Sequence, residues 1–415
     1  MYISSKEYNL LPSTKSPLRN HSRFKKFRVG GLFFALLITV FTCHFILFSY
    51  HIEQESRPII NSLSYDPSRS SWIPIPYPTT ISEKLLNQLN SDWKSSHGGF
   101  NFQSKDFPVY KPSCELRSNL SRHFPYNAST PIPKLIWQTW KLRLSDSKFP
   151  KKVSNRVQSW INNNPNYTHT LFSDADMKTF VENEFANIPQ VVDAFNLMPK
   201  PVLKADFFRY LIIFVKGGVY TDIDTINLKP IDSWVSLKPT VYDQPNNPGL
   251  VVGLEADIPK ISWVKNFARC LQFVQWTLQG KPGHPILLEL IAHITEITIN
   301  RAKNNQLLTV LGKSASDDVM NWTGPGIWSD EILKYLNKLF QNQAYLINEN
   351  WDEFNEYFNQ NSLGGFSQPI IIHDVALLPL TSFCPEANGG GKVTEPLAYV
   401  KHCFDGSWKN HKLIG

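Results

Sequence analysis

The chain has 415 residues and a formal net charge of +7 at pH 7. Residues 1–28 contain seven Lys and Arg residues and one Glu, a net charge of +6, so +7 − 6 leaves only +1 for the rest of the chain. This distribution, with no zinc-finger spacing and no Arg-rich RNA motif, excludes the broad basic surface by which proteins bind nucleic acid.

Residues 29–50 contain no Asp, Glu, Lys or Arg. As a helix this run would be about 33 Å long, enough to cross a hydrocarbon core of about 30 Å. A cleaved signal peptide is the alternative, but its apolar stretch is usually shorter, and no small-residue cleavage site follows Tyr50. The positive-inside rule then predicts a cytosolic basic tail (1–28), a transmembrane signal anchor (29–50) and a luminal remainder.

Residues 51–112 are polar and interrupted by proline, so we interpret them as a stem between the membrane and a luminal domain, 113–415. Four Asn-x-Ser/Thr triplets in that domain are candidate N-glycosylation sites: Asn119, Asn127, Asn166 and Asn321. The lumen permits disulfides, and Cys384 with Cys403 is the preferred pair; buried free thiols are the alternative.

Strand-like and helix-like segments alternate in the luminal domain. The predicted strands are Leu135–Trp137, Thr168–Phe172, Val219–Ile223, Val241–Tyr242, Leu250–Leu254, Pro369–His373 and Leu397–Val400. The predicted helices are Lys152–Asn162, Met177–Phe185, Leu203–Lys216, Ile286–Asn300 and Ser329–Phe340. This alternation predicts an α/β fold with a largely parallel sheet covered on both faces, which binds ligands at the carboxyl ends of its strands.

The most informative segment is residues 204–224. Apolar residues recur at helical spacing up to Lys216, and Gly217-Gly218 ends that helix. The next residues have strand composition and include Asp222 and Asp224, whose side chains would lie on the same side of a strand. Two carboxylates on one side offer the hard oxygen ligands that Mg²⁺ and Mn²⁺ prefer.

A second Asp-x-Asp triplet, Asp174-Ala175-Asp176, has a simpler interpretation. It follows a predicted strand and precedes a helix, so Ser173 or Asp174 is expected to cap that helix. Only the triplet after the two glycines is therefore predicted to bind a cation.

Several motifs, taken in order, resemble glycosyltransferase family 32 and are most like its fungal Golgi α-1,6-mannosyltransferases. They are Ile132-Pro-Lys-Leu-Ile-Trp137-Gln138-Thr-Trp140, Lys204-Ala-Asp206-x-x-Arg209-Tyr, Gly217-Gly-Val-Tyr220-x-Asp222-x-Asp224, Asn321-Trp-Thr-Gly-Pro-Gly326 and His402-Cys-Phe-Asp-Gly-Ser-Trp408-Lys409. The resemblance spans residues 131–415. It implies the glycosyltransferase A fold, a single Rossmann-like domain, and a retaining, metal-dependent reaction with Mn²⁺ or Mg²⁺.

The resemblance also implies roles for individual residues. Asp222 and Asp224 would be the catalytic metal ligands, with His402 as a further ligand. The residues expected to bind the nucleotide sugar are Trp137, Gln138, Asp206, Arg209, Tyr220, Trp408 and Lys409.

Residue chemistry alone leaves other interpretations open for these positions. Trp137 could be a core residue, Asp206 and Arg209 could pair along one helix face, His402 could be a partly exposed histidine, and Lys409 could be solvated. Polar groups in turn-like settings predict an acceptor surface that includes Glu255, Trp328 and Asp330, although Asp330 could instead cap a helix.

The predicted function is transfer of mannose from GDP-mannose, in α-1,6 linkage, to an N-linked glycan core in the Golgi, with the endoplasmic reticulum as the other compartment. One alternative acceptor is inositol phosphoceramide; family members that use it tend to carry an additional C-terminal membrane segment, and nothing after Tyr50 approaches 18 consecutive apolar residues. The other alternative is a non-catalytic subunit of a mannosyltransferase complex, which the intact Asp222 and Asp224 disfavour.

Overall fold

The computed structural model describes residues 99–103, 110–258, 265–311, 315–339, 358 and 363–405. Every described residue belongs to one compact unit, which lies within Asp66–Gly415. The predicted tail, the predicted anchor and most of the predicted stem lie outside the described residues, as do Trp408 and Lys409. Among the helices of the described part, none is long and apolar enough to span a bilayer.

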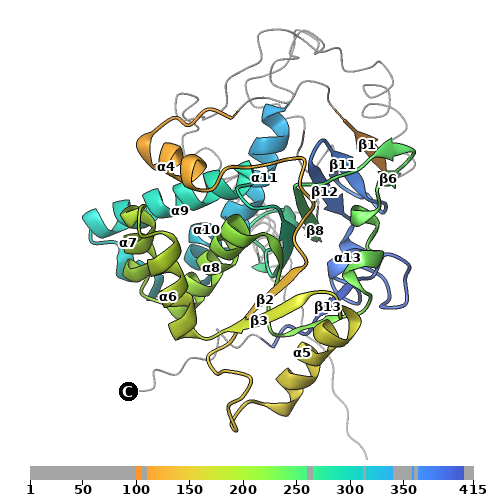
Figure 1. The fold of residues 1–415 in the computed structure, drawn as a ribbon, viewed down its shortest axis with the longest axis horizontal. Helices are drawn as coiled ribbons and strands as arrows, with labels where there is room; N and C mark the ends of the chain where they lie inside the picture. Colours follow the sequence, from red (N-terminus) through yellow and green to blue (C-terminus); the bar gives the residue numbers. More distant parts are fainter. Residues whose placement is uncertain are drawn as a thin grey trace, which may run out of the picture. The chain divides into compact units, whose positions relative to one another are not determined.

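A nine-stranded sheet forms the centre of the fold, in the order β1-β11-β12-β8-β10-β4-β2-β3, with β9 paired to β8 (Figure 1). Its strands are β1 (Phe100–Phe102), β2 (Leu135–Thr139), β3 (Thr168–Phe172), β4 (Gly218–Thr221), β8 (Leu250–Asp257), β9 (Leu271–Phe273), β10 (Thr277–Gly280), β11 (Ile370–Ile372) and β12 (Val375–Leu378). Strands β12, β8, β4, β2 and β3 run in one direction, and β10 lies antiparallel between β8 and β4. The predicted α/β class with a largely parallel sheet is confirmed, and β10 is an antiparallel strand that the sequence did not predict.

Two strand pairs lie outside this sheet. They are β5 (Thr225–Asn227) with β13 (Val400–His402), and β6 (Thr240–Val241) with β7 (Gln244–Pro245). The helices are α4 (Glu115–His123), α5 (Lys151–Asn163), α6 (Asp174–Glu184), α7 (Pro189–Leu197), α8 (Pro201–Lys216), α9 (Pro285–Lys303), α10 (Ala315–Trp322), α11 (Pro325–Lys338) and α13 (Leu380–Phe383), with 3₁₀ turns at Ile231–Ser233, Val235–Leu237 and Leu307–Leu311.

Both faces of the sheet are buried, and successive residues of a strand enter different cores. On β8, Leu250 and Val252 join the core under α6 to α11, whereas Val251 joins a second core that contains Trp160 of α5 and Phe383 of α13. This alternation is the two-residue period of a strand covered on both sides. Helix α5 therefore lies on the opposite side of the sheet from α8 and α9 (Figure 1).

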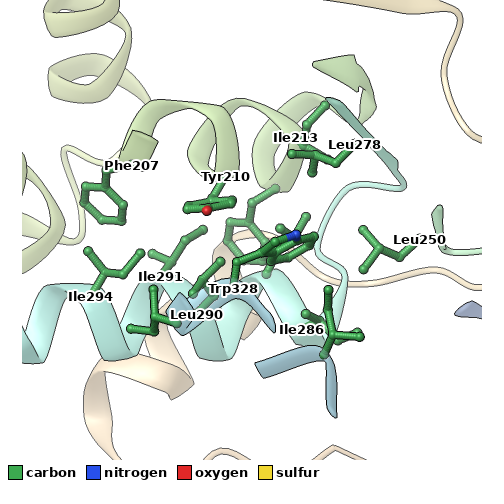
Figure 2. Close-up of a cluster of buried hydrophobic side chains, with 14 of the residues drawn as sticks. Phe207, Tyr210, Ile213, Leu250, Leu278, Ile286, Leu290, Ile291, Ile294 and Trp328 are labelled. Carbon is green, nitrogen blue, oxygen red and sulfur yellow. The ribbon is translucent and has the colours of Figure 1, made fainter. Parts of the chain in front are cut away.

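Helices α8, α9 and α11 pack together in the larger core. Figure 2 shows the ring of Tyr210 above that of Trp328, with Ile291 and Leu290 of α9 beside them. The two ring centroids are 5.4 Å apart, and Trp328 Nε1 donates to the carbonyl of Val274 at 2.9 Å. Trp328 is 0% exposed, so its predicted place on an acceptor surface is wrong: an indole with one N–H is stable in the core once that N–H is paired.

Gly217 and Gly218 join α8 to β4 in a turn that other residues could not adopt easily. Their φ angles are +66° and +95°, in the left-handed region that favours glycine. A Cβ atom on Gly218 would lie 2.6 Å from the carbonyl oxygen of Leu135. The predicted glycine stop is confirmed, and it sets β4 directly against β2.

Three predictions about element boundaries and cysteines need correction. Strand β4 ends at Thr221, so Asp222 and Asp224 lie in a turn rather than along a strand. Strand β1 pairs with β11 inside the sheet, so residues 100–102 belong to the folded domain and the boundary predicted at 112/113 is too late. Cys384 and Cys403 are both free thiols, Cys384 in the buried core and Cys403 after β13, so the preferred disulfide pair is not formed.

Replacing Trp328 by alanine should cost roughly 3–5 kcal/mol of unfolding free energy, because the change removes a fully buried aromatic ring and leaves a cavity. Urea denaturation of the purified protein measures this loss. Leu308→Ala is the control, since Leu308 is 65% exposed and should change stability by less than about 0.5 kcal/mol. Equal effects of the two substitutions would show that Trp328 is not a core residue.

Candidate active site

The Asp222–Asp224 triplet occupies the turn between β4 and β5. The turn is fixed through the backbone of Asp222: its N–H donates to the carbonyl of Trp276 at 2.7 Å, and its carbonyl accepts from Thr225 Oγ1 at 2.7 Å and Gln138 Nε2 at 3.3 Å. These contacts, rather than strand alternation, direct both carboxylates to one side.

His402 joins the two carboxylates from the far end of the sequence. Strand β13 pairs antiparallel with β5, which places His402 opposite Thr225. One ligand atom each from Asp222, Asp224 and His402 lie within 4.8 Å of one another, and His402 Nε2 is 3.2 Å from Asp224 Oδ1. The predicted grouping of these three residues is therefore confirmed by the geometry.

The donor set fits a hard divalent cation such as Mn²⁺ or Mg²⁺, since two carboxylates supply oxygen ligands and Mn²⁺ also accepts imidazole nitrogen. The Phe404 N–H donates to His402 Nδ1 at 3.2 Å, which leaves the imidazole proton on Nε2 facing Asp224. Ligation of a metal through Nε2 would require that proton to leave. Asp222 and Asp224 would thus be the primary ligands of a cation, and His402 a conditional third one.

The electrostatics of the two carboxylates differ. Burial raises the pKa of Asp222, and the neighbouring Asp224 adds to this effect while Arg209 opposes it. Burial would also raise the pKa of Asp224, but His402 and the Asp405 N–H outweigh burial and lower it. Asp224 is therefore held ionised, and Asp222 carries the charge that a bound cation would relieve most.

Arg209 of α8 lies beneath this turn and is 4% exposed. Its Nη2 is 2.9 Å from Asp206 Oδ1 and 3.2 Å from Asp222 Oδ1. Nε and Nη1 are buried without a hydrogen-bond partner. Burial raises the pKa of Asp206 to about 7 although Arg209 opposes this, and Tyr220 Oη donates to Asp222 Oδ1 at 3.0 Å. Arg209 therefore pairs with Asp206 along one face of α8 and also contacts Asp222 in the Asp-x-Asp turn.

Trp137 and Gln138 do not face an open site. Trp137 Nε1 donates to the carbonyl of Gly217 at 2.7 Å, and the indole packs in the larger core. Gln138 is 0% exposed and links Asp222 to His169, whose Nε2 lies 2.9 Å from Gln138 Oε1. Strand β2 pairs with β4 on one edge and β3 on the other, and both side chains are buried against the protein's own groups. Their contact with a nucleotide sugar stays a prediction.

Trp276 lies beside the predicted metal ligands, whereas the sequence indicated only that its turn-like segment, Gln275-Trp276, would meet the acceptor. Its ring stacks on that of His402 with centroids 4.5 Å apart, and its Nε1 donates to Glu255 Oε1 at 3.2 Å. Gln272 Nε2 donates to the other oxygen of Glu255 at 2.8 Å. Glu255 is thus held beside Trp276 and His402, and its contact with the acceptor substrate stays a prediction. Asp330 is instead bound bidentately by Arg269, at 2.6 and 2.8 Å. No spacing rule connects Trp276 with His402, since only the fold brings them together.

The second Asp-x-Asp triplet has the predicted structural role. Ser173 caps α6, its side chain accepts from the Asp176 N–H, and Asp176 accepts in return from the Ser173 N–H. Among the sequons, Asn127 and Asn166 are exposed, whereas the amides of Asn119 and Asn321 accept from Arg122 and Arg269.

A known protein family matches the part of the chain that contains both Asp-x-Asp triplets. The model of the glycosyltransferase sugar-binding region containing the DXD motif matches residues 150–240. The chain is 45% identical over 325 residues to the initiation-specific α-1,6-mannosyltransferase of Candida albicans, with 78% of this chain and 83% of the relative covered. It is 34% identical over 391 residues to the Saccharomyces cerevisiae protein of that description, with 71% and 82% covered. The chain belongs to this glycosyltransferase family.

Structural comparison adds less. The PaToxG glycosyltransferase, at 15% identity, covers 60% of this chain and 93% of its own, with a TM-score of 0.30. A score this low does not establish a shared fold. The assignment as a glycosyltransferase therefore rests on sequence identity, and the structure shows which of the two Asp-x-Asp triplets belongs to the site.

Replacing Asp224 by asparagine should lower the affinity of the glycosyltransferase for Mn²⁺ by more than about 100-fold, because residues one shell further from a metal already contribute 10- to 100-fold. Electron paramagnetic resonance titration of Mn²⁺ measures this affinity. Asp174→Asn is the matched control, since Asp174 is exposed in the capping triplet and should leave the affinity unchanged. Equal Mn²⁺ affinities of the two variants would remove Asp224 from the metal site.

His169 makes stability depend on pH. Burial lowers the pKa of His169 to about 4, whereas an unfolded histidine titrates near 6.5. Between those values the unfolded chain binds a proton that the folded chain does not, so stability falls as the pH falls from about 6.5 to about 4. The difference between the urea midpoints at pH 7 and pH 4.5 should be smaller in His169→Gln than in the unmodified protein. An identical drop in both proteins would contradict this assignment.

Proposed function

We propose that this glycosyltransferase is a retaining, metal-dependent mannosyltransferase that moves mannose from GDP-mannose, in α-1,6 linkage, onto an N-linked glycan core. The curated relatives at 45% and 34% identity, described as initiation-specific α-1,6-mannosyltransferases, support the donor sugar and the linkage. A catalytic role, rather than a non-catalytic one in a mannosyltransferase complex, is supported by the assembled Asp222, Asp224 and His402.

The observation that carries the proposal is the state of Arg209. A guanidinium with two buried, unpartnered N–H groups is unfavourable unless a ligand completes its hydrogen bonds. The same guanidinium reaches Asp222, with Nη2 3.2 Å from Asp222 Oδ1, and a nucleoside diphosphate and its sugar would be bound at that carboxylate. The planar fork of donors on arginine matches phosphate oxygens or paired sugar hydroxyls.

The chemistry required of the protein is charge stabilisation and positioning. A divalent cation bound by Asp222 and Asp224 would stabilise the negative charge on the departing diphosphate. Arg209 and Asp206 would orient the donor, and Tyr220 and Gln138 keep Asp222 and its turn in place. Front-face attack with retention, in which the departing phosphate takes the acceptor proton, requires no protein nucleophile.

The proposal also covers the fold type, the membrane topology and the remaining donor-binding and glycosylation residues. We take the folded unit as a glycosyltransferase A fold, supported by the mixed sheet with an Asp-x-Asp turn after a central strand. Residues 1–28, 29–50 and the segment that follows would be a cytosolic tail, a signal anchor and a stem, which makes the protein a single-pass type II Golgi enzyme. Trp408 and Lys409 would contact the donor, and the four sequons would be the N-glycosylation sites.

A donor and acceptor panel tests the proposal. The purified protein is incubated with Mn²⁺, several nucleotide sugars, and either an N-glycan core or inositol phosphoceramide. GDP-mannose with the N-glycan should give a product whose NMR spectrum shows a new α-1,6-linked mannose, and Asp224→Asn should give none. Transfer only to inositol phosphoceramide would replace the acceptor, and no turnover with any GDP-sugar would overturn the mannosyltransferase assignment.

A further inference from the structure

Helix α5 contacts both sequence segments that build the metal turn. On one side it is fastened to β5: Ser159 Oγ accepts from the Asn227 N–H at 3.0 Å, and Asn163 Nδ2 donates to the Asn227 carbonyl at 2.9 Å. Trp160 Nε1 donates to Thr225 Oγ1 at 3.1 Å, and the same hydroxyl donates to the carbonyl of Asp222. The helix therefore supports the turn from the side of the sheet opposite α8.

One turn earlier along the helix, α5 holds the segment that follows β13. Arg156 is 5% exposed, and its Nη1 and Nη2 lie 2.6 and 3.2 Å from the two carboxylate oxygens of Asp405. Lys152, four residues earlier on the same helix face, adds a contact to Asp405 at 3.1 Å. Burial of an arginine is costly unless its partner is well placed, so this pair constrains where Asp405 can lie.

The segment that Asp405 anchors wraps around Asp224. The Cys403 N–H donates to the Asp224 carbonyl at 2.8 Å, and the Asp405 N–H donates to Asp224 Oδ2 at 3.1 Å. His402, in the same segment, is 3.2 Å from Asp224 Oδ1. Both carboxylate oxygens of Asp224 therefore have their directions set by residues 402–405.

We propose that Arg156 is a positioning residue for metal binding: through Asp405 it holds residues 402–405 against Asp224, so that His402 and Asp224 are arranged before a cation arrives. The metal-binding part of this inference rests on the proposed function. Arg156 itself does not contact the ligand atoms, and its effect on a cation passes through the C-terminal segment. The ordinary interpretation, a salt bridge that only stabilises the fold, makes a different prediction.

In Arg156→Gln, the loss of charge and the loss of the anchor should change Mn²⁺ affinity in opposite directions, so this variant distinguishes the two effects. Removal of a positive charge near the site would by itself strengthen Mn²⁺ binding. Loss of the anchor should instead weaken it by about tenfold, the scale on which outer-shell partners contribute to metal affinity. Asp405→Asn should weaken it to a similar degree, and the double variant should be no worse than either single one, because the two residues act through one contact.

A matched control is available in the ion pair of Arg301 with Asp318, which also joins an aspartate to an arginine bidentately, on α9 and α10. Asp318→Asn removes a comparable pair without touching α5, β5 or residues 402–405. It should lower stability as Asp405→Asn does, yet leave Mn²⁺ affinity unchanged.

The experiment combines Mn²⁺ titration by electron paramagnetic resonance with amide hydrogen exchange of the metal-free protein. Arg156→Gln and Asp405→Asn should both accelerate exchange of the amides of residues 403 and 405 and weaken Mn²⁺ binding, whereas Asp318→Asn does neither. Unchanged exchange, or tighter Mn²⁺ binding by Arg156→Gln, would overturn the inference. If the unmodified protein bound no Mn²⁺, the proposed function would fail, and the exchange rates would still decide whether Arg156 anchors the segment.

Discussion

Two carboxylates lie side by side at the end of a buried strand, and the surrounding structure is organised to tolerate their charge. Asp222 and Asp224 repel each other in a setting that burial already makes unfavourable for anions. Arg209 approaches from α8, His402 from β13, and backbone N–H groups from the segment after β13. These groups offset part of the negative charge, and a divalent cation would offset the rest.

The supports come from both layers that cover the sheet. Helix α8 supplies Arg209 and Asp206 from the side of the larger core, where its apolar residues are fixed against α9 and α11 (Figure 2). Helix α5 lies on the other side and fastens β5 and residues 402–405. The Asp-x-Asp turn is therefore held between two packed layers, and both carboxylates are already directed to one side in this structure. Such preorganisation is what electrostatic catalysis requires.

Local signals in the sequence predicted this site in part. The helical period before Lys216, the two glycines and the carboxylates are neighbours in the chain, so their arrangement follows from short-range geometry. The same local reasoning identified the capping triplet at Ser173 correctly. It placed Asp222 and Asp224 along a strand, however, because two contacts with the Asp222 backbone come from distant residues, the carbonyl of Trp276 and the side-chain amide of Gln138, and β4 ends at Thr221.

Long-range contacts explain most of what was missed. The stacking of Trp276 on His402 and the burial of Trp328 against Tyr210 depend on how distant elements pack. The residue spacing around Trp276 and Trp328 does not indicate these contacts. Strand β10 is short and contains two polar residues, Thr277 and Gln279, that become buried only between β8 and β4. Trp137 and Gln138 lie on β2, which pairs with β4 and β3 on its two edges, and both side chains are buried there.

The site described above requires that the Asp222–Asp224 turn bind a cation, and that this cation hold a nucleoside diphosphate. Calorimetric titration of GDP and of GMP, each with Mn²⁺ and with a chelator, tests it most directly. We expect Mn²⁺ to strengthen GDP binding by at least about tenfold, which is about 1.4 kcal/mol, and to have little effect on GMP, which lacks the second phosphate. Equal GDP affinity with Mn²⁺ and with the chelator would contradict it.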